Sequence, residues 1–414
     1  MKKLVSILLT ATLAVGCLVG CGSNAGTDAP AGTEAAADNG AATTEAATND
    51  AADVADAADA EAAVDVTDPN AIPDEMTSED GTYQIAFVTD VGQLKDGSFN
   101  EGTWNGVKLY AAANGLSYKY YQPANGSDAT DIDRQNAMEA AAAAGADLVV
   151  CAGFLQGTAL AEAAKNYPDT KFLFVDGWTL GLENVTAVVF QEEQCGYFAG
   201  YAAVADGFTK LGFCGGGGGT NPACCRYLYG YIQGANAAAA ELGVEDVEIK
   251  YTWQYGDSYS ASTELQTLAN GWYESGTEII FSCGGSIDSS IFAAASANDA
   301  YTIGVDVNQA GDSDTVVTSA MKELAQSVQN VAADVYAGNW DKLADVCQTL
   351  GAADGCTGIP TDAASWRFEK FTVDQYQAIF DSVVSGDLVI DADYGTGEYN
   401  FSTDYSNVTV IAVN

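Results

Sequence analysis

The chain contains no histidine among its 414 residues. This absence excludes catalysis by a Ser-His-Asp triad or a Cys-His pair, and nearly all zinc-hydrolase chemistry. Acid–base chemistry would have to use carboxylates, Lys or Tyr. Basic residues are also scarce, with 15 Lys and Arg against 57 Asp and Glu and a net charge of −42. That balance argues against nucleic acid or an anionic membrane surface as a partner, since both require basic patches.

Motifs that bind phosphate or metal are also missing. The five glycines at 215–219 lack the G-x-x-x-x-G-K-[ST] pattern, and Pro222 interrupts any G-x-G-x-x-G passage into a helix. We interpret the run as a flexible turn at a strand end. The ten cysteines include no C-x-x-C pair, which argues against a zinc or thioredoxin-type site. Cys347 and Cys356 could close a small loop as a disulfide or remain free thiols. We expect neither a cofactor nor a metal.

The first 21 residues resemble a lipoprotein signal peptide. A basic start precedes an apolar stretch at 4–19, which is short for a membrane span of about 20 residues. "LVGC" at 18–21 resembles a bacterial lipobox and implies lipidation of Cys21, with "AVGC" at 14–17 as a second candidate. An ordinary cleaved signal is the alternative. We expect the protein on the extracytoplasmic face of the cell membrane, held by lipid chains.

Residues 22–80 form a separate compositional segment. Ala, Asp, Glu, Thr and Gly dominate it, and no Lys or Arg occurs between Cys21 and Lys95. It has too few large apolar residues to build a core, and its like charges repel one another. We therefore predict a disordered acidic tether between the membrane and the folded part.

From residue 83 onward, apolar strand-like segments alternate with helical segments. "YQIAFVTD" and "ADLVVCAG" read as buried strands, and "SFNEGTWNGVKLYAAANG" reads as a helix that ends at Gly115. Such alternation predicts parallel sheets covered by helices. About ten such units exceed one compact sheet, so we predict an α/β fold with two doubly wound parallel-sheet lobes. The expected parts are 82–188 for the first part of the N-lobe, 189–308 for the C-lobe, 309–345 for a return segment to the N-lobe, and 346–414 for a C-terminal segment completing the lobes.

Strand ends predict the chemistry of the site, because ligands of such sheets bind at the carboxyl ends of strands. These ends combine acids, aromatic residues and glycines, a composition that suits a neutral, hydroxyl-rich, ring-bearing ligand better than a phosphate. Phe99 stands in the polar loop "TDVGQLKDGSFNEGTW", where its ring is available for stacking. Packing into the core at a helix start is the alternative for Phe99. Two converging carboxylates could also hydrolyse a glycosidic bond, so a hydrolase stays open.

The segment "IAFVTDVGQLKDGSFNEGTWNGV" resembles the start of the basic-membrane-protein family of bacterial lipoproteins. Matching segments follow in order, among them "YPDTKFLFVDG", "NVTAVVFQEEQCGYFAGYAA", "GTEIIFSCGG", "IGVDVNQ" and "VVTSAMKELAQSV". The resemblance covers residues 84 to about 335. It implies a type I periplasmic-binding-protein fold with two hinged lobes, and a monomer that is not an enzyme. Such a protein would capture purine nucleosides such as inosine, guanosine or adenosine and deliver them to the transmembrane subunits of an ABC permease.

The resemblance also implies roles for individual residues. Phe99 would stack on the purine, Asp176 would hydrogen-bond the base, and Asp90, Ser98 and Asn100 would lie at the ligand edge.

Further residues would contact the sugar or the second face of the base. Asp306 would bind the ribose hydroxyls, and Lys322 would reach the ribose across the hinge. The remaining candidates are Gly284 and Gly285 for close backbone approach to the sugar, and Tyr255, or else Trp253, for the second stacking ring. A sugar or another ring compound as ligand of the same fold, and a surface receptor for signalling, are the remaining alternatives.

Overall fold

The computed structural model describes residues 65–91, 93–394, 401 and 405–413. The chain divides into two units, residues 1–61 and 62–414, and the described residues belong to the second unit. The expected signal peptide, the lipidation at Cys21 and the first part of the expected tether lie outside the described residues. In the described part of the chain, no helix combines the length and the apolar character that a membrane crossing requires.

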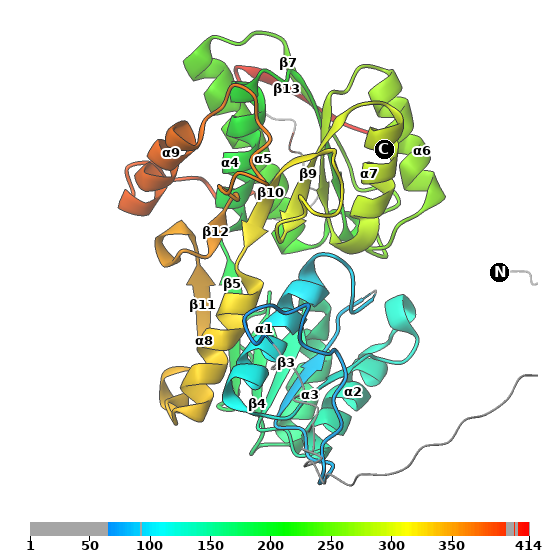
Figure 1. Cartoon of the computed structure of the whole chain (residues 1–414), viewed down its shortest axis with the longest axis vertical. Coiled ribbons are helices and arrows are strands. Elements are labelled where there is room, and N and C mark those ends of the chain that lie inside the picture. Colours follow the sequence, from blue (N-terminus) through cyan, green and yellow to red (C-terminus); the bar gives the residue numbers. More distant parts are fainter. Residues whose placement is uncertain (1–64, 92, 395–400, 402–404, 414) are drawn as a thin grey trace, which may run out of the picture. The chain divides into compact units, whose positions relative to one another are not determined.

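The second unit contains two sheets, one in each of two lobes (Figure 1). The N-lobe sheet has the order β11-β5-β4-β3-β1-β2, and its strands pair in parallel. Its strands are β1 (Ile85–Val88), β2 (Tyr118–Tyr121), β3 (Leu148–Ala152), β4 (Lys171–Val175), β5 (Val185–Phe190) and β11 (Cys347–Leu350). Its helices are α1 (Phe99–Asn114), α2 (Asp131–Ala143), α3 (Gly157–Asn166) and α8 (Leu324–Tyr336). α1 ends at Gly115 as predicted, with this glycine in the left-handed conformation.

Helices cover both faces of the N-lobe sheet. Ile85 and Phe87 of β1 face a cluster that includes Trp104 of α1 and Val328 of α8. The intervening side chains of β1 face a second cluster, which includes Met138 of α2 and residues of α3. Apolar residues at consecutive positions of β1 are therefore buried on both faces, which explains the continuous apolar run "IAFV".

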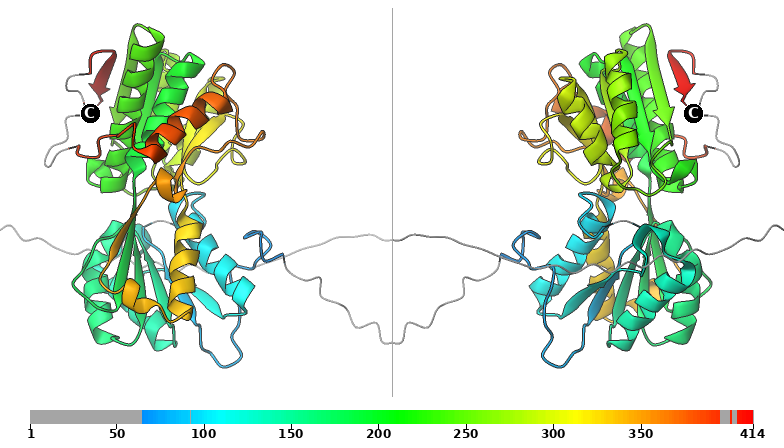
Figure 2. Two further views of the ribbon diagram at one scale, coloured as in Figure 1. Left: turned by 90° about the vertical axis from the view of Figure 1, so that its left-hand side faces the viewer. Right: turned by 90° about the vertical axis from the view of Figure 1, so that its right-hand side faces the viewer.

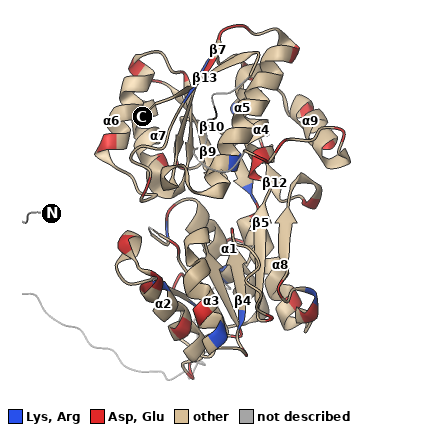
Figure 3. Ribbon diagram, turned by 180° about the vertical axis from the view of Figure 1, so that it is seen from behind, with Lys and Arg blue, Asp and Glu red and all other residues tan. Residues whose placement is uncertain are grey.

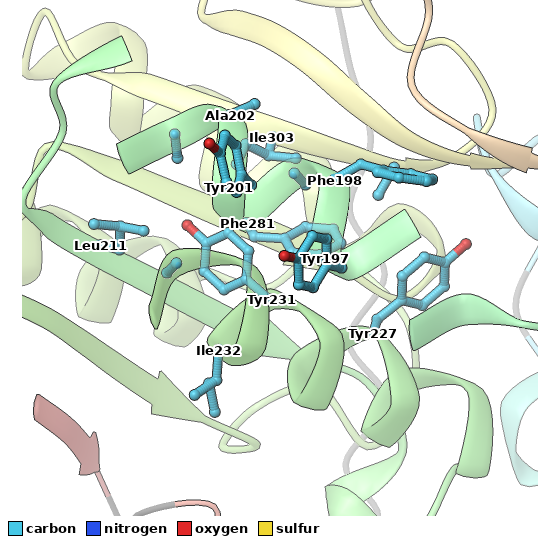
Figure 4. Packing of buried hydrophobic residues seen from close by; sticks show 14 of the residues in the cluster. Tyr197, Phe198, Tyr201, Ala202, Leu211, Tyr227, Tyr231, Ile232, Phe281 and Ile303 are labelled. Carbon is cyan, nitrogen blue, oxygen red and sulfur yellow. The ribbon is translucent and has the colours of Figure 1, made fainter. Parts of the chain in front are cut away.

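The C-lobe sheet has the order β12-β10-β9-β8-β6-β7-β13, with β12 antiparallel to β10. Its strands are β6 (Lys210–Gly215), β7 (Val247–Thr252), β8 (Ile279–Cys283), β9 (Tyr301–Asp306), β10 (Val316–Lys322), β12 (Thr357–Gly358) and β13 (Val408–Ala412). Its helices are α4 (Glu192–Asp206), α5 (Pro222–Leu242), α6 (Thr263–Glu274), α7 (Asp288–Ala297) and α9 (Val373–Ser385). Figure 4 shows Tyr197, Phe198 and Tyr231 from the helices packed around Phe281 and Ile303 of the sheet.

The chain passes between the lobes after β5, after β10 and after β11, and Figure 2 shows these passages from the side. The predicted return to the N-lobe at residue 309 is too early. β10 pairs in register with β9, so residues 316–322 belong to the C-lobe sheet, and the chain returns at the start of α8. β11 then adds an edge strand to the N-lobe sheet.

Residues 65–80, the last part of the predicted disordered tether, are instead packed on the N-lobe. Ile72 is 3% exposed and belongs to the cluster of Trp104. The buried Lys108 ammonium donates to the carbonyl oxygens of Pro69 and Ile72, at 2.8 and 3.3 Å, and pairs with Asp74 at 2.8 Å. Trp104 Nε1 and the Tyr118 hydroxyl also donate to this segment, to Asp74 at 2.9 Å and to the Pro73 carbonyl at 2.7 Å. A segment whose composition predicted disorder is thus held by apolar contacts and hydrogen bonds.

Two further features bear on the predictions. Cys347 and Cys356 are free, because Cys347 packs against the cluster on one face of the N-lobe sheet and Cys356 belongs to the cluster on the other.

Figure 3 shows acidic residues spread over both lobes among sparse basic ones.

Candidate functional site

A cavity lies between the lobes, where the carboxyl ends of strands from both sheets meet. It contains about 510 Å³ of space outside protein atoms, part of it open to solvent. Carboxylates, aromatic rings and glycines predominate in its walls, as the strand ends predicted. The lining residues are Asp90, Val91, Asp96, Phe99, Asn100, Gly153, Phe154 and Asp176 of the N-lobe, together with Asn221, Ala223, Cys224, Tyr227, Tyr259, Cys283, Gly284, Gly285, Val305, Asp306 and Lys322.

The loop before α1 explains how Phe99 reaches the cavity. Asp96 caps the helix, because its carboxylate accepts from the backbone N–H groups of Ser98 at 3.0 Å, Asn100 at 3.0 Å and Glu101 at 3.1 Å. The Ser98 hydroxyl makes no capping bond. It donates instead to Asp306 Oδ2 of the other lobe, over 2.7 Å. Phe99 is the first residue of α1, so this cap fixes the point at which its ring is presented.

Asn100 lines the cavity, but its amide is used within the loop. Its Oδ1 accepts from the Asp90 backbone N–H at 2.9 Å, and its Nδ2 donates to the Val91 carbonyl at 3.2 Å and to Asp96 at 3.0 Å. The side chain therefore positions Asp90 and the capping carboxylate.

Asp90 offers an open carboxylate oxygen. Its Oδ1 is buried and has no hydrogen-bond partner within the described part of the protein. Burial raises the pKa of Asp90 to about 7, although Arg134 opposes this. Gly153 leaves room for the group, since a β-carbon at that position would lie 2.0 Å from Asp90 Oδ2.

Lys322, the last residue of β10, lies among three carboxylates. Its Nζ lies 2.6 Å from Asp176 Oδ2, 3.4 Å from Glu192 Oε1 and 3.7 Å from Asp306 Oδ1. It also lies 4.8 Å from the centre of the Phe99 ring. Burial alone would lower the pKa of Lys322, but the three carboxylates outweigh it and raise the pKa. The lysine is therefore charged, and it neutralises acids contributed by both lobes.

Asp176 directly follows β4 and Asp306 is the last residue of β9, and both have strained backbone conformations. Their φ angles are 55° and 65°, in the left-handed region that non-glycine residues rarely adopt and that is enriched at functional sites. Burial raises the pKa of Asp176 to about 6, although Lys322 opposes the shift. Asp176 Oδ1 is a second buried oxygen for which the described residues provide no hydrogen-bond partner.

Sequence reasoning missed the ion pair behind Lys322. Glu192 begins α4 and is fully buried, and its Oε2 accepts from Arg226 Nε of α5 at 2.6 Å. Burial would raise the pKa of Glu192, but Arg226 and Lys322 hold it below its ordinary value. The sequence carries no local signal for this pair, because helix packing alone brings the two residues together.

Neither candidate for the second stacking ring lines the cavity. Tyr255 is 49% exposed and does not line the cavity. Trp253 packs into the C-lobe core, with its ring 5.6 Å from that of Phe213. The aromatic ring that lines the cavity from this loop is Tyr259, whose hydroxyl accepts from Asn221 Nδ2 at 2.9 Å. Tyr259 stands four residues after Tyr255, in the same turn. The sequence pattern did not indicate which aromatic residue of this turn faces the cavity.

The glycine-rich strand ends provide the seat for Tyr259. A β-carbon at Gly216 would lie 2.5 Å from the ring, and one at Gly217 would lie 2.1 Å from the hydroxyl. Gly284 and Gly285, which line the cavity as predicted strand-end glycines, border the same residue. The glycine run therefore makes space for an aromatic residue at a tight turn. Among the described residues, no group of His, Cys, Asp or Glu is arranged to hold a metal ion.

The sequence of the chain is similar to those of known proteins. A family model described as Bmp, ABC transporter substrate-binding protein PnrA-like, matches residues 83–385. The ABC transporter nucleoside-binding protein BmpA of Lactococcus lactis subsp. cremoris is 31% identical over 272 residues, which are 60% of this chain and 74% of the relative. Basic membrane protein A of Borreliella burgdorferi is 27% identical over 252 residues, with 59% and 70% covered.

Solved structures show the same fold. A solute-binding protein of an ABC transporter system from Aeropyrum pernix K1 has a TM-score of 0.63 at 21% identity, covering 75% of this chain and 94% of that one. A second, from Conexibacter woesei, has a TM-score of 0.58 at 20% identity and covers 75% and 99%. These likenesses confirm the predicted two-lobed fold of solute-binding proteins.

Proposed function

Because the chain belongs to the Bmp family of PnrA-like ABC transporter substrate-binding proteins, we propose that it captures a purine nucleoside between its lobes. The observation that carries the proposal is the composition of the cavity. One wall presents the Phe99 ring beside open carboxylate oxygens, and the other presents Asp306 and Lys322 where a sugar would enter. Such a cavity offers stacking to a base and charged hydrogen-bond partners to hydroxyls.

The base would be held by stacking and by acceptors at its edge. Stacking on an aromatic side chain contributes about 1–3 kcal/mol per base. We assign this role to Phe99 and Tyr259, two of the aromatic residues that line the cavity. Asp176 has a pKa of about 6, raised by burial, so it is largely ionised at neutral pH. Its open oxygen would then accept from an N–H group of the purine.

The ribose would be held by groups of the C-lobe. The Asp306 carboxylate would accept from hydroxyl groups, and the Lys322 ammonium would donate to their oxygens. Gly284 and Gly285 would allow the sugar to approach the backbone closely.

Function follows from closure of the lobes. Phe99 and Asp176 belong to one lobe and Asp306 to the other, so a ligand makes its full set of contacts only when the lobes are together. It therefore shifts the population toward the closed form. Delivery to the transmembrane subunits of the importer would follow, from a position at the membrane that lipidation of Cys21 would secure.

A hydrolase is the alternative that uses the same acids. Lys322 argues against it, because its Nζ lies 2.6 Å from Asp176 and 3.7 Å from Asp306 and compensates both charges. A carboxylate paired in this way is a poorer nucleophile or base than an unpaired one. We therefore favour capture of an unchanged ligand.

Calorimetric titration with a panel of ligands tests the proposal. The protein is unfolded and refolded first, to remove ligand retained from the cells, and titrated with inosine, guanosine, adenosine, cytidine, uridine, ribose and glucose. We expect purine nucleosides to bind most tightly and to be recovered unchanged after hours. Tight binding of a free sugar would overturn the ligand assignment, and release of free base would support the hydrolase.

A further inference from the structure

A hydrogen bond joins the lobes beside the cavity without involving a cavity residue. Gln309, which follows β9 in the C-lobe, donates from Nε2 to the backbone carbonyl oxygen of Gly97 in the N-lobe, over 2.9 Å. Gln309 is fully buried and is not among the lining residues. Other cross-lobe bonds in this region, from Ser98 to Asp306 and from Lys322 to Asp176, use residues that line the cavity.

The C-lobe fixes the Gln309 side chain in the orientation that the bond requires. Its Oε1 accepts from the Val305 backbone N–H at 2.8 Å, and its own backbone N–H donates to Ser319 Oγ at 3.0 Å. Gly304 provides the space, because a β-carbon there would lie 2.5 Å from Gln309 Oε1. The amide is thus oriented by contacts that do not depend on the N-lobe.

The second Nε2 proton is also used within the C-lobe. Nε2 donates to Asp288 Oδ2 over 2.5 Å, at the start of α7. The loop that carries Gln309 is held in turn by Arg367, which donates to the carbonyl oxygens of Ala310 at 2.7 Å and Ser313 at 2.8 Å. One amide proton therefore remains for the opposite lobe, and it points at Gly97.

We propose that Gln309 is a closure latch, meaning a positioning residue that stabilises the closed lobes through Gly97 without contacting the ligand. Gly97 directly precedes Ser98 and Phe99, so the latch also holds the loop that presents the stacking ring. The nature of the ligand rests on the proposed function, whereas the effect of the latch on the lobes does not.

The expected size follows from the bond itself. One hydrogen bond contributes about 1 kcal/mol, and about 1.4 kcal/mol corresponds to a factor of ten. Losing the bond lowers the closed fraction of the ligand-free protein, and apparent affinity falls in proportion to that fraction. We expect a five- to tenfold loss of affinity, expressed mainly as faster dissociation.

Gln309→Met tests the latch, because Met keeps the length of the side chain and removes its amide, and with it the bonds to Gly97, Asp288 and Val305. Small-angle scattering of the ligand-free protein measures closure, and stopped-flow with inosine measures dissociation. We expect a larger radius of gyration than wild type, a five- to tenfold faster dissociation, and the wild-type radius at saturating inosine. Gln329→Met is the control, since among the described residues Gln329 Nε2 bonds the Ala325 carbonyl of its own helix, at 3.3 Å, and no group of the other lobe.

Two further results keep the test decisive. Gly304→Ala keeps Gln309 in the chain, but its β-carbon would lie 2.5 Å from Gln309 Oε1 and would displace the amide. It should open the ligand-free protein in the same way, provided that circular dichroism shows it folded. Wild-type scattering and dissociation in a folded Gln309→Met protein would overturn the latch. If wild type binds no nucleoside, the proposed ligand is wrong, and scattering of the ligand-free proteins still decides on the latch.

Discussion

Lys322 pairs with carboxylates from both lobes. It compensates Asp176 of the N-lobe and Glu192 and Asp306 of the C-lobe, and it is almost fully buried. Removing one partner of a buried ion pair costs about 3–5 kcal/mol, because the remaining charge is left uncompensated.

We therefore expect Lys322→Met to lower the free energy of unfolding by about that amount and to abolish nucleoside binding. Urea unfolding monitored by tryptophan fluorescence measures the first effect. Lys322→Arg, which keeps the charge, should retain more stability. The control Lys119→Met removes a lysine that lies over the Tyr83 and Tyr121 rings and has no acidic ion-pair partner among the described residues. Equal midpoints for Lys322→Met and wild type would contradict the assignment.

Asp90 gives a prediction in pH. Burial raises its pKa to about 7, so its ionisation in the folded state costs free energy. Its favourable contribution is fully present below the unfolded pKa of about 4 and is lost as the pH rises through about 7. The free energy of unfolding of wild type should therefore fall as the pH rises from 4 to 8, and that of Asp90→Asn should not show this fall. The difference between the two proteins should change by about 2–4 kcal/mol in favour of Asp90→Asn. Unfolding curves of the ligand-free proteins at both pH values measure the difference, and parallel pH profiles would refute it.

Residues within a continuous motif could be predicted from the sequence, and residues assembled by packing could not. Phe99, Asp176 and Lys322 each stand in a recognisable segment, and the structure brings all three to one cavity. Tyr259 was missed because its turn gives no periodic signal. Arg226 was missed because its role depends on a partner 34 positions away.

At the scale of elements, the contact between α4 and α5 positions the charges. A β-carbon at Gly230 would lie 1.9 Å from the Glu193 carbonyl oxygen, and one at Gly196 would lie 2.1 Å from the Tyr227 carbonyl oxygen. The two helices therefore approach backbone to backbone, and Arg226 reaches Glu192 as a result.

Gly230→Ala should separate these helices. We expect it to lower the free energy of unfolding by about 2–3 kcal/mol, in the range of overpacked cores, and to weaken nucleoside binding by disturbing Glu192. Gly271→Ala is the control, because a β-carbon at that position in α6 meets nothing within 4 Å. It should stabilise the protein by about 0.5–1 kcal/mol. Differential scanning calorimetry compares the two, and a stabilised Gly230→Ala would show that the helices tolerate separation.

Strand and helix positions up to residue 336 were predictable at this scale, whereas β11, β12, α9 and β13 beyond it were not predicted. The lobe to which a strand belongs was not predictable either. β10 reads as an apolar strand whichever sheet it joins, and only its register with β9 assigns it to the C-lobe. Residues 65–80 were assigned to the tether for a related reason. Their composition is polar, and a single buried isoleucine with one buried lysine is too sparse a signal to indicate docking.

At the scale of the whole molecule, the family, the fold and the cavity agree with one another. The family is that of ABC transporter substrate-binding proteins, and the fold brings strand ends of two lobes to one site. The excess of negative charge does not conflict with a neutral ligand, because the acids that line the cavity are buried and Lys322 compensates two of them.

Paired calorimetric titration of inosine into refolded wild type and Phe99→Ala tests the central claim most directly. Phe99→Trp serves as the control that retains a stacking surface. We expect one site in wild type and near-wild-type affinity in Phe99→Trp. In Phe99→Ala we expect an affinity about 10- to 100-fold weaker, which corresponds to the loss of one stacked base. Equal affinities in wild type and Phe99→Ala, or no binding by refolded wild type, would contradict it.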